Sequence, residues 1–326
     1  ATAVGMAMAA RYERGLLDPT AATNQSVFDH AIWVICSDGD LQEGVSAEAS
    51  SLAGTQELGN LNIIYDDNRI SIEGDTHVSF TEDVSARYRA YGWEVIEIPA
   101  HSNGDVDLVK LDKAMTQAAG NLKQPTLIRL KTVIAWPAPQ AKGTAKSHGS
   151  ALGAEEIAAT KKELGLNPDE HFAFPQNLLD HSRLVKQRGA SLRKEWNTKF
   201  EAWKNAEPER AKTLKRVLSQ ELPADWDSLI PIFESGKDIA TRKASGDVIN
   251  ALAQKLPEMW GGSADLADSN NTTIEGGDSF LPESSAMKNA NPYGRIIHFG
   301  IREHAMGSIL NGIALSGLTK AFAGTF

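Results

Sequence analysis

The first third of the chain alternates between short apolar runs and stretches with helical spacing. Ala31–Cys36 is a continuous run rich in β-branched residues, which predicts a buried parallel strand. Glu43–Leu58 has the apolar spacing of a helix, and Gly59 follows where a helix C-terminus favours glycine. The alternation predicts a doubly wound α/β domain, whose ligands lie at the carboxyl ends of its parallel strands. It continues through strands at Leu61–Tyr65, Trp93–Ile98 and Thr126–Ile134 and helices at Asp83–Tyr91 and Val106–Ala119.

A second α/β unit is predicted to begin near residue 236. Residues 248–252 have helical apolar spacing, and a predicted strand ending in the Gly261-Gly262 pair follows them. Arg295–Phe299 and Glu303–Leu318 are predicted as a further strand and a further helix. We therefore expect two doubly wound parallel-sheet domains separated by a linker, with the ranges 1–210, 211–235 and 236–326.

Both ends of the chain interrupt a predicted secondary-structure element. Ala1 opens directly into a helical run rich in Ala and Met, and Ala321–Phe326 stops where a strand or a turn is expected. Chain termini are usually polar and frayed. We interpret the sequence as an internal piece of a longer chain, in which the first domain lacks its front and the second lacks its back.

The composition is that of an ordinary globular protein. Of 326 residues, 41% are hydrophobic and 23% are charged, which excludes collagenous and disordered chains. The single cysteine, Cys36, excludes an intrachain disulfide and favours a reducing, cytoplasmic compartment. No apolar run approaches the roughly 18–20 residues that span a bilayer, so no membrane partner is expected.

The charge balance narrows the class of partner. With 33 Lys+Arg against 42 Asp+Glu the net charge is −9, which argues against nucleic acid and leaves a small anionic substrate open. Residues 182–217 are basic and carry aromatics, as in some sites for RNA or phosphate. Because acids are interleaved there, a solvated helix packed by its Trp and Phe face is favoured.

Polar residues follow two neighbouring strands where those strands end. Asp38 follows the first strand within Ser37–Gly44 (SDGDLQEG), and Asn68 follows the second, 30 residues after Asp38. Carboxylate and amide oxygens suit Mg²⁺ that is shared with phosphate. Gly39 would let the backbone approach a phosphate, and a helix starting near Glu43 would offer its N-terminus to it. Asp, Gly and Asn are also common in plain turns, so both interpretations stay open.

Three further segments are candidates. Glu303 stands at a predicted strand-to-helix junction, where the helix dipole favours a carboxylate even without a catalytic role. Gly261–Asn270 (GGSADLADSN) follows a predicted strand and on its own would be an Asx-rich turn. Residues 135–153 form a loop rich in Pro, Gly and Ala that contains His148, and loops of this length often carry function.

Together these motifs resemble the transketolase family. The Ser-Asp-Gly and Asn68 pair is similar to the thiamine diphosphate and magnesium motif, with Ser37 where that motif normally has its first glycine. The resemblance implies two thiamine diphosphate-binding-type domains, a diphosphate-binding (PP) domain and then a pyrimidine-binding (Pyr) domain, both incomplete. Further similar segments follow in family order at 51–55 (SLAGT), 65–72, 90–93 (AYGW), 147–149 (SHG), 241–245 (TRKAS), 261–266 (GGSADL) and Glu303.

The resemblance implies a metal site in the first domain. Asp38, Asn68 and the backbone carbonyl of Ile70 would hold Mg²⁺, or Ca²⁺ or Mn²⁺ in its place, against the diphosphate of thiamine diphosphate. Gly39 would lie beside the diphosphate. Glu43 would join a carboxylate cluster near the dimer interface, although alone it would be an ordinary first-turn acid.

The resemblance implies further contacts with the cofactor. Glu303 would act as a catalytic residue by hydrogen-bonding the ring nitrogen of the aminopyrimidine, which prepares the amine to deprotonate the thiazolium carbon. His148 would be the second catalytic residue, facing the thiazolium and the substrate oxygens. Asp265 would lie near the cofactor, and Phe326 would be an aromatic of the pyrimidine pocket.

The resemblance also implies the substrate and the assembly. Arg242 and Ser269 would bind the sugar phosphate together with His148, because Arg offers a bidentate fork. The expected reaction transfers a two-carbon ketol unit between sugar phosphates in a homodimer whose active sites lie at the subunit interface. Dihydroxyacetone synthase, 1-deoxyxylulose-5-phosphate synthase and a non-catalytic interaction module are the alternatives, and the isolated 326-residue chain is expected to be inactive.

Overall fold

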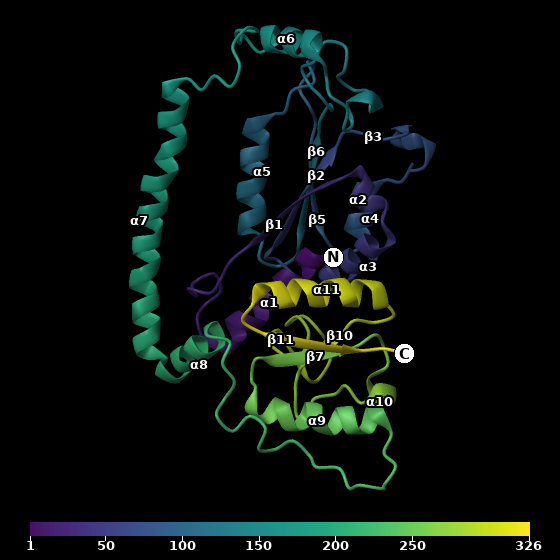
Figure 1. The fold of residues 1–326 in the computed structure, drawn as a ribbon, viewed down its shortest axis with the longest axis vertical. Coiled ribbons are helices and arrows are strands. Elements are labelled where there is room, and N and C mark those ends of the chain that lie inside the picture. Colours follow the sequence, from purple (N-terminus) through teal and green to yellow (C-terminus); the bar gives the residue numbers. More distant parts are fainter.

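The computed structural model describes residues 1–326, and Figure 1 shows two layered units connected by helices. The first sheet is parallel throughout, in the order β1-β2-β6-β5. Ser37 pairs with Asp66, so the carboxyl ends of β1 and β2 lie side by side. The strands of this sheet are β1 Ile32–Ser37, β2 Leu61–Asp67, β5 Glu94–Ile98 and β6 Thr126–Lys131, and β2 is followed by the hairpin β3 Ile70–Ser71 and β4 Gly74–Asp75.

Helices cover both faces of the first sheet, as the doubly wound prediction requires. On one face, Ala114 and Ala118 of α5 pack against Ile128 of β6. On the other face, side chains from helices of both units share an apolar cluster with Leu61 and Leu127. The helices of this unit are α1 Thr2–Leu17, α3 Gly44–Thr55, α4 Val84–Ala90, α5 Leu108–Gly120 and α6 Ala154–Glu163.

The helix expected to start at Glu43 begins at Gly44, and a separate short helix that was not predicted precedes it. A short α2 (Asp38–Gln42) follows β1 directly, because the Asp40 carboxylate accepts hydrogen bonds from the backbone nitrogen of Ser37 (2.8 Å) and from its hydroxyl (3.2 Å). Glu43 is then an extended residue between α2 and α3, with φ −63° and ψ 125°. The serine that replaces the usual motif glycine therefore takes part in starting the helix.

The burial predicted for the first strand is only half right. β1 is the edge strand of its sheet, and Trp33 and Ile35 are 38% and 79% exposed. Nothing in the chain covers that part of the face, so an apolar run of the fully buried type lies half in solvent. The other three strands of the sheet lie within a few residues of their predicted ranges.

The second unit is another all-parallel sheet, in the order β11-β7-β10-β8-β9. Gly261 and Gly262 lie inside β7, where a Cβ on Gly262 would stand 1.8 Å from the carbonyl oxygen of Ile297. The elements are β7 Met259–Ser263, β8 Ser279–Phe280, β9 Ala290–Asn291, β10 Ile296–His298, β11 Lys320–Gly324, α9 Thr241–Lys255, α10 Ala267–Asn270 and α11 Glu303–Ser316.

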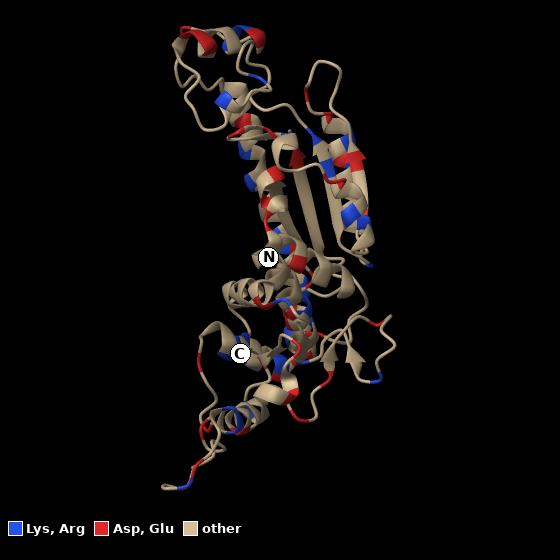
Figure 2. Ribbon diagram, turned by 90° about the vertical axis from the view of Figure 1, so that its right-hand side faces the viewer, with Lys and Arg blue, Asp and Glu red and all other residues tan.

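Two helices, α7 (Gln176–Ala206) and α8 (Pro208–Leu218), run between the units. Trp196 stacks on Phe200, and Trp203 is buried with its indole nitrogen donating to the carbonyl of Leu17 at 3.1 Å. Figure 2 shows acidic and basic residues interleaved over the molecule. The prediction of a solvated helix packed by its aromatic face is confirmed. None of the helices in the chain is long and apolar enough to cross a membrane.

Helix α11 connects the two units by packing on α1. The two backbones approach closely, since a Cβ on Gly5 would stand 2.0 Å from the carbonyl oxygen of Ile309. Tyr12 of α1 stacks on Trp260 of β7, with ring centroids 4.3 Å apart. One apolar cluster therefore runs from the first sheet through α1 and α11 to the second sheet.

Glu13 of α1 is a destabilising feature of this packing. Its side chain is buried, its Oε1 has no hydrogen-bond partner, and burial raises its pKa from 4.5 to about 7. Between these two pH values the folded state keeps a proton that the unfolded chain has lost. Stability contributed by this group therefore falls as the pH rises through that window.

We expect Glu13→Gln to raise the free energy of unfolding by roughly 2–3 kcal/mol at pH 8 and by less than about 1 kcal/mol at pH 5. The neutral amide removes the cost of burying a charge, and that cost is small where the carboxyl is already protonated. Urea unfolding at the two pH values measures the difference. An equal gain at both would contradict the assigned cause.

Candidate active site

Asp38 and Asn68 meet at the carboxyl edge of the first sheet. Asp38 begins α2 and is 2% exposed. Its Oδ1 accepts a hydrogen bond from the Tyr65 hydroxyl at 2.6 Å, and its Oδ2 accepts one from the backbone nitrogen of Arg69 at 3.1 Å. The Oδ1 of Asn68 accepts a bond from the backbone nitrogen of Ile70 at 2.9 Å. These bonds hold the turn after β2 against the start of α2.

The neighbouring Asp67 shows how a buried acid is usually balanced. It accepts hydrogen bonds from Arg129 Nε at 2.7 Å and Lys131 Nζ at 3.1 Å. Asp38 forms no ion pair, and burial raises its pKa, with the Asp67 charge adding to the shift. Asp38 is therefore a buried carboxylate for which the chain supplies no paired cation.

The oxygen donors around Asp38 fit a divalent cation shared with phosphate. A carboxylate, the amide oxygen of Asn68 and the carbonyl of Ile70 on β3 are hard donors of the kind Mg²⁺ prefers. The chain has no group of three or more His, Cys, Asp or Glu placed to hold a metal, so a cation would depend on this mixed set. Gly39 adds space, because no atom lies within 4 Å of the place its Cβ would occupy.

Tyr65 holds Asp38, and sequence reasoning does not assign it a role. Tyr65 lies in β2 opposite Cys36 of β1, and its phenolic hydroxyl donates the hydrogen bond to Asp38. The only indication in the sequence is that Tyr65 lies in an apolar strand, next to the strand that precedes Asp38. That signal becomes specific only once the register of β1 and β2 is known.

Three more candidates lie at the carboxyl edge of the second sheet. β7, β10 and β11 run parallel and in register around Ser263, so the residues that follow them share one edge. Asp265 follows β7 with φ +61°, Glu303 begins α11 after β10, and Phe326 follows β11. All three side chains are exposed. None of them makes a side-chain hydrogen bond or an ion pair within the chain.

Arg242 and Ser269 lie at one corner of the same unit. Arg242 is in the first turn of α9 and Ser269 is in α10, both with exposed side chains. A Cβ on Gly246, one turn after Arg242, would stand 2.8 Å from the Cβ of Asn271, so α9 and the end of α10 are in close contact. Figure 1 shows this corner on the same side as the C-terminal end.

His148 stands apart from both groups. It follows a short 3₁₀ turn, Ala145–Ser147, in the loop after β6, and its side chain is exposed. Within the 326 residues, no hydrogen bond or ion pair joins His148, the Asp38 group and the Glu303 group. One chain therefore assembles the candidate residues as separate sets on two sheet edges and a loop.

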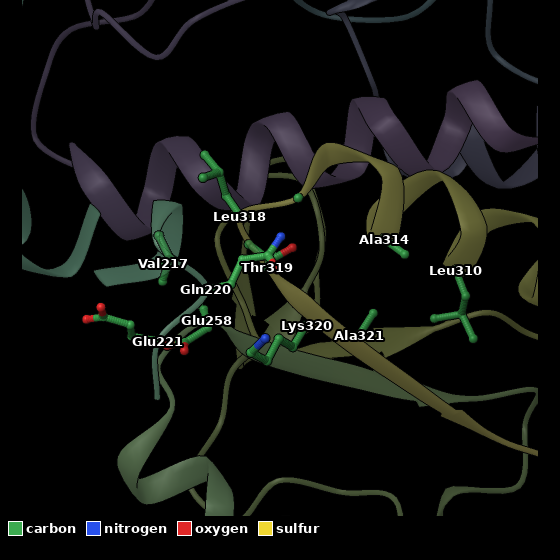
Figure 3. Close-up of a pocket in the computed structure, with 11 residues that line it drawn as sticks. Val217, Gln220, Glu221, Glu258, Leu310, Ala314, Leu318, Thr319, Lys320 and Ala321 are labelled. Carbon is green, nitrogen blue, oxygen red and sulfur yellow. The ribbon is translucent and has the colours of Figure 1, made fainter. Parts of the chain in front are cut away.

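Two cavities of the chain lie away from the candidate residues. One of about 350 Å³ is bounded by the end of α8, by α11 and by β11, and Figure 3 shows Glu258 and Lys320 on its wall. Another of about 1290 Å³ lies where the amino ends of the first sheet meet the segment from β8 to β10. Neither of these two cavities is lined by a candidate residue.

The sequence matches two family profiles. Residues 1–223 match "Transketolase, thiamine diphosphate binding domain". The chain belongs to the transketolase family. Residues 237–326 match "Transketolase, pyrimidine binding domain". The matches confirm the resemblance and the two-domain α/β fold, while the boundaries at 210 and 235 remain predictions.

Transketolases are similar to the chain along its whole length. That of Mycobacterium tuberculosis is 53% identical over 100% of this chain and 46% of its own. The Pichia stipitis transketolase in complex with sedoheptulose-7-phosphate is 39% identical, with a TM-score of 0.92, and matches 100% of this chain and 47% of its own. The Leishmania mexicana transketolase is 35% identical, with a TM-score of 0.90, over 100% and 46%. The chain spans about half the length of these transketolases.

Proposed function

We propose that this chain is part of a transketolase that reversibly transfers a two-carbon ketol unit from a ketose phosphate to an aldose phosphate, in the pentose phosphate pathway. The observation that carries the proposal is Asp38, a buried carboxylate without a paired cation, beside Asn68 at a parallel sheet edge. It lies in the part of the chain that matches a thiamine diphosphate-binding family. The sugar phosphate bound by the Pichia stipitis relative supports the substrate class.

The first domain would hold the metal and the diphosphate. Asp38, Asn68 and the carbonyl of Ile70 would bind Mg²⁺, or Ca²⁺ or Mn²⁺, with the open backbone at Gly39 beside the phosphates. When bound, thiamine diphosphate supplies an electron sink for the two-carbon unit. These residues would hold the cation whose charge balances the diphosphate, and would thereby fix the charged end of the cofactor in place.

The second domain would control the proton. Glu303, at the first turn of α11, would hold a proton between its carboxylate and the ring nitrogen of the aminopyrimidine. Asp265 and Phe326 follow neighbouring strands at the same edge and would border that ring. From the first domain, His148 would hydrogen-bond the substrate oxygens.

Arg242 and Ser269 would bind the phosphate of the sugar. In the intact enzyme we expect Arg242→Ala to raise KM for phosphorylated sugars by about 10–100-fold with little change in kcat, because a guanidinium contact is made equally in the ground and transition states. Steady-state kinetics measure the split. Lys243→Ala is the control, since Lys243 pairs with Asp247 of its own helix. A fall in kcat with unchanged KM would contradict the assignment.

The two sheet edges of one chain carry different parts of the machinery. We propose that a homodimer completes each site, with the Asp38 edge of one subunit facing the Glu303 edge of its partner. The lone cysteine, Cys36, supports a cytoplasmic location.

A coupled assay of the intact protein tests the proposed reaction. Xylulose-5-phosphate and ribose-5-phosphate should react only when thiamine diphosphate and Mg²⁺ are present, and the 326-residue chain alone should show no turnover. Formaldehyde as the preferred acceptor would favour dihydroxyacetone synthase. Pyruvate as donor with glyceraldehyde-3-phosphate as acceptor would favour 1-deoxyxylulose-5-phosphate synthase.

A further inference from the structure

The turn that leads into Glu303 is built around Arg302. Phe299, which follows β10, is fully buried, and Gly300 has φ +66°, a region that favours glycine. The Arg302 guanidinium folds back over this turn, and its Nη1 donates to the carbonyl oxygen of Phe299 at 2.9 Å. A Cβ on Gly300 would stand 2.6 Å from that nitrogen, so the glycine leaves room for the arginine.

The same side chain reaches the other structural unit. Nη2 of Arg302 donates to the hydroxyl of Ser51 on α3 at 3.1 Å. One helical turn earlier on α3, Glu48 accepts a hydrogen bond from the backbone nitrogen of Ala305 at 3.0 Å. Residues three apart share a helix face. One face of α3 therefore holds the first turn of α11 at two points.

The rest of α11 is anchored elsewhere. Ala305, Met306 and Ile309 are buried, and Gly312 approaches α1 so closely that a Cβ there would stand 1.9 Å from a carbonyl oxygen. The side chain of Glu303 itself is exposed and bonds to nothing in the chain. The direction in which Glu303 leaves the helix is thus set by its neighbours.

We propose that Arg302, by joining the Phe299 carbonyl to the Ser51 hydroxyl, is a positioning residue for Glu303, an inference that rests on the proposed function. Arg302 forms no ion pair with a carboxylate, and its two side-chain bonds go to neutral oxygens. A planar guanidinium spans two acceptors at fixed directions, whereas a lysine ammonium is a point charge on a flexible stem. The arginine therefore sets geometry at the start of α11.

Variants of the intact enzyme test this role through kcat and KM for xylulose-5-phosphate. Arg302→Gln is expected to lower kcat by about 100-fold and to change KM by less than about 3-fold, since small misplacements of a reacting group are costly. Arg302→Lys should recover only part of that loss, and Ser51→Ala should lower kcat by about 3–10-fold. Thr55→Ala is the control, because the Thr55 hydroxyl bonds only to the backbone of its own helix.

Hydrogen exchange of the cofactor-free protein gives a readout independent of turnover. Arg302→Gln and Ser51→Ala should speed amide exchange over residues 303–306 and leave residues 309–313 unchanged. Unaltered kcat in folded Arg302 variants, or faster exchange along all of α11, would overturn the positioning role. If Arg302→Gln fails to fold, Arg302→Lys and Ser51→Ala decide. Glu303→Gln separates the two proposals. Full turnover in that variant would refute the catalytic role proposed for Glu303, whereas lost turnover there together with unaltered kcat in the Arg302 variants would refute the positioning role alone.

Discussion

Glu303→Ala in the intact enzyme is expected to lower ketol transfer by about 1000-fold while leaving the fold unchanged. The Glu303 side chain is exposed and makes no hydrogen bond or ion pair within the chain, so its loss removes no buried polar contact. The groups that hold α11, among them Ala305 and Ile309, are untouched. What is lost is the proton held at the ring nitrogen of the cofactor.

Turnover with xylulose-5-phosphate and ribose-5-phosphate, together with the melting temperature, measures this prediction. Glu209→Ala is a matched control, because Glu209 is a first-turn acid of α8 remote from both sheet edges. Glu303→Ala should have the melting temperature of the parent enzyme and should bind the diphosphate end of the cofactor normally. Turnover at the parent rate would remove Glu303 from the mechanism.

Asp38→Ala is expected to weaken the binding of thiamine diphosphate by about 100–1000-fold in the presence of Mg²⁺. The carboxylate is buried with no paired cation, so the bound metal is the group that would balance its charge. Without added metal, parent and variant should bind the cofactor about equally poorly. The metal-free variant should also be no less stable than the parent, because burial of an unbalanced charge is unfavourable.

Calorimetric titration with thiamine diphosphate, once with added Mg²⁺ and once with a chelator, measures the cofactor affinity with and without metal. Glu73→Ala is the control. It removes an exposed carboxylate in the turn of the β3–β4 hairpin and leaves the Asp38 contacts in place, so the affinity of this variant should remain metal-dependent. Normal, metal-dependent affinity in Asp38→Ala would show that the cation is held elsewhere.

Local pattern was enough for the elements that carry the site. Apolar runs and helical spacing predicted β2, α5 and α11 close to their observed positions, because burial and periodicity are local properties of a chain. The start of α2 was missed, since it depends on the Asp40 side chain reaching back to Ser37. The exposure of Ile35 was missed as well, because the residues of a strand do not determine whether that strand lies at the edge of its sheet.

The sequence by itself determined the family, the two α/β units and the residue types at the strand ends, because motif spacing and hydrophobic period are one-dimensional. Only the tertiary structure decided which buried carboxylates are paired with a cationic side chain. It pairs Asp67 with Arg129 and leaves Asp38 to the Tyr65 hydroxyl and a backbone nitrogen. It also brings Arg302 to Ser51 from 251 residues away. Such contacts follow from strand register and helix packing, which join residues that no local pattern relates.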